Sequence, residues 1–195
     1  MKYIQDLRKH FKNAVVFSKS DIKIFLKSKK ISVKYLELMI HNLLAKHEIK
    51  RISRGIYTFR DEIQVVGFAF RPFYYGLQDA LSLRNLWEQE TNPVVITPRK
   101  VRKGLRTFEG RNYLVKTINR RMFFGFEMIK YGDFWIPVSD IEKTLIDFVY
   151  FREPLGEDVL GEIKKKIDKN RLKNYLKRSP RWVRERIYSV YSVRI

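Results

Sequence analysis

The sequence contains no cysteine, and none of its apolar runs is long enough to cross a bilayer. Without thiols the chain cannot form disulfides, thiolate zinc sites, iron–sulfur clusters or a cysteine nucleophile. Charged residues interrupt the apolar stretches well before the ~20 positions that a membrane-spanning helix requires. The first residues mix charged and apolar side chains, whereas a secretion signal needs an unbroken apolar stretch. We therefore expect a soluble, cytoplasmic protein with no membrane partner.

Acidic residues are scarce, because 21 Asp and Glu stand against 41 Lys and Arg, which gives a net charge of +20. Residues 1–60 carry a net charge of +11 and residues 161–195 a net charge of +9, whereas residues 61–160 are balanced. Charge concentrated on particular parts of a chain indicates a docking surface for a polyanion. Hydrophobic residues still make up 45% of the chain, which is enough for a packed core in one large or two small domains.

The first 60 residues follow a pattern of short helices and a hairpin. Apolar residues at helical spacing predict helices over about residues 3–12, 19–27 and 33–47. Ser18 with Asp21 resembles a capping box before the second helix, and Ser32 is the expected N-cap of the third. The next segment, IKRISRGIYTFR, reads as two short strands. We therefore predict an α+β fold, with a winged helix-turn-helix over residues 1–60 and a mixed α+β domain over residues 61–195.

The third helix and the hairpin carry side chains suited to DNA. In the major groove Asn pairs with adenine and Lys with guanine or phosphate, while basic residues on a hairpin reach the neighbouring backbone. The predicted DNA-binding residues are Ser32, Lys34, Tyr35, His41, Asn42, Lys46, Lys50, Arg51, Ser53 and Arg54. The residues expected to face the core are Val33, Leu36, Ile40, Leu43 and Leu44. The alternative is a helical domain used for protein contact, which the charge of residues 1–60 disfavours.

The rest of the chain reads as a small mixed sheet with a basic helical C-terminus. We expect a helix over about residues 74–87, a buried strand between Pro93 and Pro98, and several further strands. Ser179 and Pro180 are the expected N-cap and first position of a terminal helix. Its apolar face would carry Val183, Ile187, Val190 and Tyr191. Its other face would carry a candidate second basic surface of Arg181, Arg184 and Arg186.

A dense group of carboxylates, Asp140, Glu142 and Asp147, lies around another predicted helix, for which Ser139 is the expected N-cap. A metal-dependent nucleic-acid-processing enzyme would use such groups to hold a divalent ion. However, no Gly-rich phosphate loop or His base accompanies them, and the histidines lack metal-ligand spacing. We therefore expect no metal, no cofactor and no catalysis, and assign the carboxylates to caps and ion pairs. A non-specific nucleic-acid or RNA-binding protein, in which Tyr and Arg stack on bases, is a third alternative.

Two segments of the second half also resemble a known family. They are the tyrosine-glycine segment FYYGLQDAL, with PVVIT after it, and the EKTLID helix, which follows a predicted strand ending in Ile136, Pro137 and Val138. Together with the preceding winged helix, these segments resemble the AbiEi-type antitoxins of abortive-infection systems, described as transcriptional regulators of viral defence. The chain departs from the family pattern at Asp79, where Ser is common, and at residues 83–85, which replace a His-Gly pair.

The resemblance implies a type IV antitoxin that opposes a nucleotidyltransferase-like toxin encoded nearby. It also implies a repressor that binds double-stranded DNA at inverted repeats in its own operator. An operator of this kind allows the protein to bind as an oligomer. The winged helix would then read the operator, and the second domain would carry the antitoxin effect and assembly.

Overall fold

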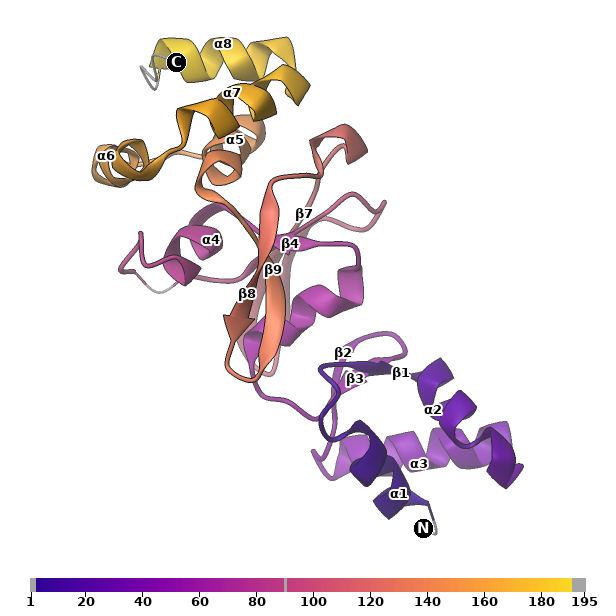
Figure 1. Ribbon diagram of the computed structural model, residues 1–195. Coiled ribbons are helices and arrows are strands. Elements are labelled where there is room, and N and C mark those ends of the chain that lie inside the picture. The colour runs from indigo at the N-terminus through magenta and orange to yellow at the C-terminus, as the bar shows by residue number, and fades with distance from the viewer. Residues whose placement is uncertain (1–2, 90, 191–195) are drawn as a thin grey trace. The chain divides into compact units, whose positions relative to one another are not determined.

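A computed structural model describes residues 3–89 and 91–190 of the chain (Figure 1). The fold is mixed α+β, with one three-stranded and one six-stranded sheet, which confirms the predicted class. Within the described residues, no helix combines the length and apolar character that crossing a bilayer requires.

The chain divides into two compact units that interleave in sequence. The first unit holds the described residues up to Ala69 together with Thr107–Arg111, and the second holds Phe70–Arg106 and the described residues from Asn112 onward. The predicted boundary near residue 61 lies before the observed one, because the N-terminal stretch of the first unit continues through most of the 3-10 helix Ile63–Phe70 and ends at Ala69.

The N-terminal unit alternates helices and short strands. Its elements are α1 (Ile4–Phe11), β1 (Phe17–Ser18), α2 (Lys19–Phe25), the 3-10 turn Lys27–Lys29, α3 (Val33–Ala45), β2 (Lys50–Ser53) and β3 (Ile56–Thr58). The three strands are ordered β1-β3-β2, and both pairings are antiparallel. The predicted caps are confirmed: Ser18 and Asp21 form a capping box on α2, and Ser32 Oγ accepts the Tyr35 backbone N–H at 3.2 Å.

The buried face of α3 differs from the predicted one at Val33, Met39 and Leu44, the last of which is half-buried and lines a cleft. Leu36, Met39, Ile40 and Leu43 are buried there, with the i, i+3, i+4, i+7 spacing of an amphipathic helix. Met39 was not among the predicted core residues. Val33, which was, is 55% exposed because it lies on the first turn, at the edge of a surface hollow rather than over the core.

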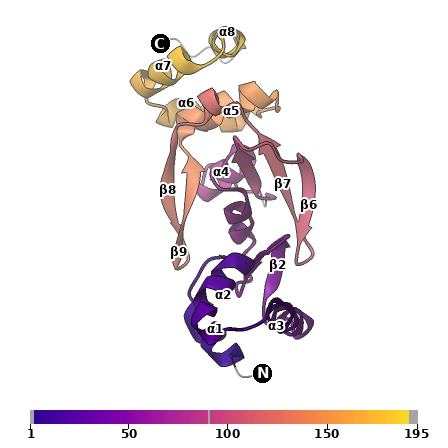
Figure 2. The same cartoon turned by 90° about the vertical axis from the view of Figure 1, so that its right-hand side faces the viewer.

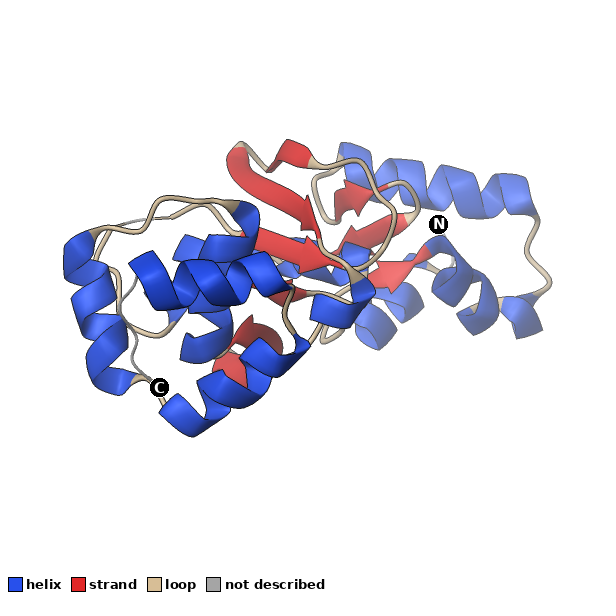
Figure 3. Cartoon of the chain, turned by 90° about the horizontal axis from the view of Figure 1, so that it is seen from above, coloured by secondary structure: helices blue, strands red, loops and turns tan. Residues whose placement is uncertain are grey.

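The second unit packs helices against a mixed sheet. Its elements, apart from the β6–β7 tip Thr107–Arg111 that belongs to the first unit, are β4 (Tyr74–Tyr75), α4 (Leu77–Leu83), β5 (Val94–Thr97), β6 (Gly104–Phe108), β7 (Arg111–Thr117), the 3-10 turn Arg120–Met122, β8 (Phe126–Tyr131), β9 (Phe134–Ser139), α5 (Ile141–Phe151), α6 (Glu157–Lys166), α7 (Lys169–Arg178) and α8 (Arg181–Val190). The strand order is β6-β7-β5-β4-β9-β8, and β4 runs antiparallel to β5 but parallel to β9. Helices α5 to α8 gather at one end of this sheet (Figure 2), and Figure 3 looks down on them.

The predicted helix over residues 74–87 is wrong at both ends. Tyr74 and Tyr75 form strand β4, because they pair with β5 on one side and β9 on the other. Gly76 is the N-cap of α4, and a Cβ there would collide with the Ile96 side chain. The helix ends at Leu83. A two-residue strand held by distant partners leaves no local signal in the sequence.

Two predicted N-caps are displaced by one residue. Ser139 ends β9, and Asp140 caps α5 by accepting the Lys143 backbone N–H at 2.7 Å. The Ser179 hydroxyl donates backward to the Tyr175 carbonyl at 3.0 Å, while the Pro180 carbonyl accepts the first bonds of α8. In α8, Val183 and Ile187 are buried as predicted. The side chain of Val190 and the residue Tyr191, also predicted on this face, lie outside what the structure describes.

Candidate nucleic-acid interface

Helix α3 exposes a polar face on the side opposite its core residues. Lys34, Glu37, Leu38 and His41 are exposed, and their i, i+3, i+4, i+7 spacing places them along a single side of the helix. Leu38 is 51% exposed and gives this face an apolar patch. A helix with such a face is about the right width for the major groove of DNA.

The same face lines a cleft between α3 and the turn that joins β2 to β3. The cleft has a volume of about 650 Å³ and is lined by Lys19, Glu37, Ile40, His41, Leu44, Arg51, Arg54, Gly55 and Tyr57. Gly55 has φ +77°, a left-handed conformation that allows the tight turn between the strands. Arg51 and Arg54 are exposed on that turn and its strand, and the Arg51 guanidinium lies 5.9 Å from the Tyr57 ring. Three cationic side chains therefore line one cleft with His41.

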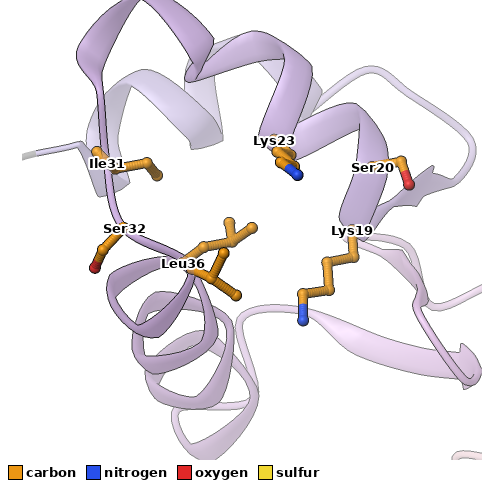
Figure 4. Close-up of a pocket in the computed structure, with 7 residues that line it drawn as sticks. Lys19, Ser20, Lys23, Ile31, Ser32 and Leu36 are labelled. Carbon is orange, nitrogen blue, oxygen red and sulfur yellow. The ribbon is translucent and has the colours of Figure 1, made fainter.

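A smaller hollow of about 270 Å³ lies between α2 and the start of α3 (Figure 4). Lys19, Ser20 and Lys23 of α2 line one side of it, and Ile31, Ser32 and Leu36 line the other. The Ser32 side chain already caps α3, and the Lys19 ammonium is paired with Glu37 at 2.6 Å, so Lys23 supplies the other ammonium group of this hollow.

The predicted site residues divide by exposure. Those that are exposed are Ser32, Lys34, His41, Lys46, Arg51 and Arg54, and those that are half-buried are Tyr35, Asn42, Lys50 and Ser53. Tyr35 packs edge-on against Tyr3 at a ring distance of 6.3 Å. The Lys50 ammonium pairs with Asp61, and the Lys50 side chain is only 13% exposed. The cleft brings together only His41, Arg51 and Arg54 from the predicted set.

Sequence reasoning missed Glu37 and Lys19, which form an ion pair at 2.6 Å in the cleft. Helical spacing could have placed Glu37 in the site, because it lies three positions after Lys34 and four before His41 on a predicted helix. No such spacing could have identified Lys19, because it comes from another helix.

A second basic cluster was also missed, in the connection from β5 to β6 and on β6 itself. It comprises Arg99, Lys100, Arg102, Lys103 and Arg106, with no acidic residue between Thr97 and Glu109. The Arg106 guanidinium lies 5.0 Å from the Phe70 ring and donates to the Arg102 carbonyl at 2.7 Å, so it anchors the loop. Counting residues 61–160 as one balanced segment concealed this cluster.

The arginines of α8 do not share one face. Val183 and Ile187 form the buried stripe, and Arg184 and Arg186 lie on either side of it, because residues two apart on a helix point about 200° apart. Arg181 is bonded to Glu185 at 2.6 Å. The candidate second basic surface is therefore spread around α8.

The carboxylates Asp140, Glu142 and Asp147 are each held by protein groups. Asp140 caps α5 and also accepts the Tyr175 hydroxyl at 2.7 Å, while Glu142 accepts the Asp168 backbone N–H at 2.6 Å. Burial raises the pKa of Glu142, and the Asp168 N–H opposes that rise. In the part of the chain that the structure describes, no three His, Asp or Glu side chains are arranged to hold a metal ion.

Asp147 belongs to a fully buried network inside the second unit. Its carboxylate pairs with the Lys143 ammonium one turn earlier on α5 and accepts the Tyr74 hydroxyl at 2.9 Å. Burial raises the pKa of Asp147 and lowers that of Lys143, while the attraction between the two groups opposes both shifts. Neither side chain is exposed, so this network cannot reach a ligand in the surrounding solvent.

Comparison with known proteins gives a likeness of fold. No protein-family model matches the chain, and no curated protein matches it. Among solved structures, the chain is similar to the crystal structure of the RV2827C protein from Mycobacterium tuberculosis, with a TM-score of 0.64 at 12% sequence identity. The match covers 97% of this chain and 74% of that one. At this identity the likeness extends to the fold alone.

Proposed function

We propose that the N-terminal unit is a winged helix-turn-helix that binds double-stranded DNA, and that the chain regulates transcription through this binding. The observation that carries the proposal is the cleft in which the exposed face of α3 meets Arg51 and Arg54 of the β2–β3 hairpin. The order of the elements, with α3 followed by a hairpin and β3 between β1 and β2, supports the same assignment.

In this arrangement the two sides of the cleft have different tasks. Helix α3 would enter the major groove with Lys34, Glu37 and His41 toward the base edges. Arg51 and Arg54 would contact the phosphates beside the groove, where a charge positions the protein but reads no sequence. Lys19 and Lys23 of α2, which line the neighbouring hollow, add to the same electrostatic attraction.

The second unit would supply assembly and the antitoxin effect, a role that rests on the sequence resemblance. The buried and capped states of Asp140, Glu142 and Asp147 favour a structural role for them over catalysis. Growth rescue from an adjacent nucleotidyltransferase-like toxin is the readout for the antitoxin role.

Arg54→Ala is expected to weaken binding to every duplex about 3- to 10-fold and to reduce the salt dependence by about one counterion, because a phosphate contact carries no sequence information. His41→Ala, on the exposed face of α3, is expected to weaken binding mainly to the preferred duplex. Fluorescence anisotropy with a selected duplex, a shuffled duplex and single-stranded RNA measures both effects.

Lys12→Ala is the control, because Lys12 is an exposed cation of the same unit that does not line the cleft. It should change each affinity by less than about 2-fold. Equal losses on selected and shuffled DNA for both Arg54→Ala and His41→Ala would contradict the assignment of α3 as the reading helix. Tighter binding to single-stranded RNA than to any duplex would contradict the proposed function.

A further inference from the structure

Glu37 carries a negative charge on the face of α3 that we propose binds DNA, which is itself a polyanion. It is the one acidic residue among the residues of α3, and its side chain is 57% exposed. Lys34 precedes it and His41 follows it on the same face of the helix. Together with Arg51 and Arg54, His41 and Glu37 line the cleft.

The side chain of Glu37 is held in the cleft by a neighbouring helix. The Lys19 ammonium on α2 donates to Glu37 Oε1 at 2.6 Å. A carboxylate has two oxygens with about four acceptor positions, so this bond leaves Glu37 free to accept another donor. An ammonium has three donors, so Lys19 can bind a phosphate while it holds Glu37.

A carboxylate beside DNA is repelled by the phosphates unless it accepts a hydrogen bond from a base. In the major groove the amino groups of cytosine and adenine are the available donors. Adenine presents the N7 acceptor next to its amino group, which would repel the second oxygen of a carboxylate. Cytosine presents its N4 amino group without that acceptor, so it is the base that a glutamate prefers.

We infer that Glu37 is a specificity-determining residue that accepts a hydrogen bond from the N4 amino group of a cytosine in the major groove. This inference rests on the proposed function and adds to it the chemical identity of one base in the preferred site. Lys19 would orient the carboxylate and bind the phosphate beside it.

The test uses the full chain and a duplex selected from a random pool. Each base pair of that duplex is then replaced in turn, and affinity is measured by fluorescence anisotropy for the wild type and for Glu37→Gln. In the wild type, replacement of one cytosine should weaken binding about 5- to 100-fold. Glu37→Gln should abolish that preference or shift it to adenine, which glutamine pairs with, and should leave preferences at distant positions unchanged.

Glu48→Gln is the matched control, because Glu48 is also ion-paired in this unit, with Arg8 at 2.7 Å, but does not line the cleft. It should leave every base preference unchanged. Lys19→Gln separates orientation from readout. It should weaken all binding and reduce the cytosine preference only in part. Thermal unfolding of each variant confirms that the unit is folded.

The outcomes distinguish this inference from the function on which it rests. If the wild type prefers particular bases and Glu37→Gln keeps every preference, Glu37 only ties α2 to α3, and the inference is overturned while the proposed function stands. The same conclusion follows if Glu37→Gln and Lys19→Gln both lower the unfolding temperature and change no preference. If the wild type binds no duplex, or binds all duplexes equally, both the proposed function and this inference are contradicted.

Discussion

Lys143→Met is expected to lower the free energy of unfolding by about 3–5 kcal/mol, which is the loss typical when one partner of a buried ion pair is removed. The variant leaves the Asp147 carboxylate fully buried, with only the Tyr74 hydroxyl as a partner. Burial already raises the pKa of Asp147, so without the ammonium the carboxyl must take up a proton or remain as an uncompensated charge. Urea denaturation at pH 7, followed by circular dichroism, measures the loss.

The double variant Lys143→Met, Asp147→Leu should recover most of that loss, because well-packed apolar side chains often replace a buried pair at little cost. Lys165→Met is the control: Lys165 pairs with Glu162 on the exposed surface, where an ion pair contributes less than about 1 kcal/mol. If Lys143→Met cost no more than Lys165→Met, the buried network would have no part in stability.

Asp79→Asn is expected to stabilise the protein at pH 8 by about 2–4 kcal/mol and to have little effect at pH 4. Burial raises the pKa of Asp79 from its ordinary 3.8 to about 8, and the Val94 backbone N–H at 3.2 Å opposes the rise only partly. At about 1.4 kcal/mol per pKa unit, the gap of about four units corresponds to at most about 6 kcal/mol, and relaxation of the surroundings reduces this destabilisation.

The direction in which stability changes with pH follows from the pH at which the folded and the unfolded protein each release the Asp79 proton. The folded protein keeps the Asp79 proton up to about pH 8, whereas the unfolded chain releases it near pH 4. The contribution of the Asp79 carboxyl to the free energy of unfolding is therefore fully present below pH 4. It is lost as the pH rises toward 8, and it stays lost at higher pH. Asparagine cannot ionise and can still accept the Val94 N–H. Denaturation of both proteins between pH 4 and pH 8.5 should show a widening difference, and a constant difference would contradict the buried, protonated Asp79.

An Asp6→Asn variant provides the reference for that comparison. Asp6 is exposed in the first turn of α1, so its stability difference should stay small across the same range. Serine at position 79 would be neutral at every pH. An Asp79→Ser variant should likewise lose the pH dependence.

The N-terminal elements could be predicted because their signals are local. The Ser18 and Asp21 capping box and the Ser32 cap mark the starts of α2 and α3 within three residues of sequence. The apolar spacing on α3 also located its exposed face, including Lys34 and His41. The prediction failed at Val33, since apolar spacing cannot tell whether a neighbour covers the first turn of a helix.

In the second unit, several features could not be predicted because they depend on residues that are distant in the sequence. Strand β4 is two residues long and exists because β5 and β9 lie on either side of it, which no window of sequence around Tyr74 contains. Asp147 was assigned with its neighbours to a cap or an ion pair, and it does form an ion pair, but with Lys143 of its own helix and fully buried. The four-residue spacing of that pair was readable, whereas its burial depends on elements far away in the chain.

The candidate site could be predicted only in part, because some of its contacts join elements that are separate in the sequence. Residues on α3 and the hairpin were found because they belong to one contiguous pattern. The pairing of Lys19 with Glu37 was not, because it joins two helices. Asn42 and Tyr35 were assigned to the exposed face from spacing alone, and both are half-buried.

The measurement that tests DNA binding most directly is the affinity of the full chain for its selected duplex as a function of salt. If the basic surfaces neutralise on the order of 5 to 8 phosphates, log K should fall linearly with log salt, with a slope of about −4 to −7. The selected duplex should stay more tightly bound than the shuffled one throughout the titration. A slope near zero, with equal affinity for both duplexes, would contradict the account.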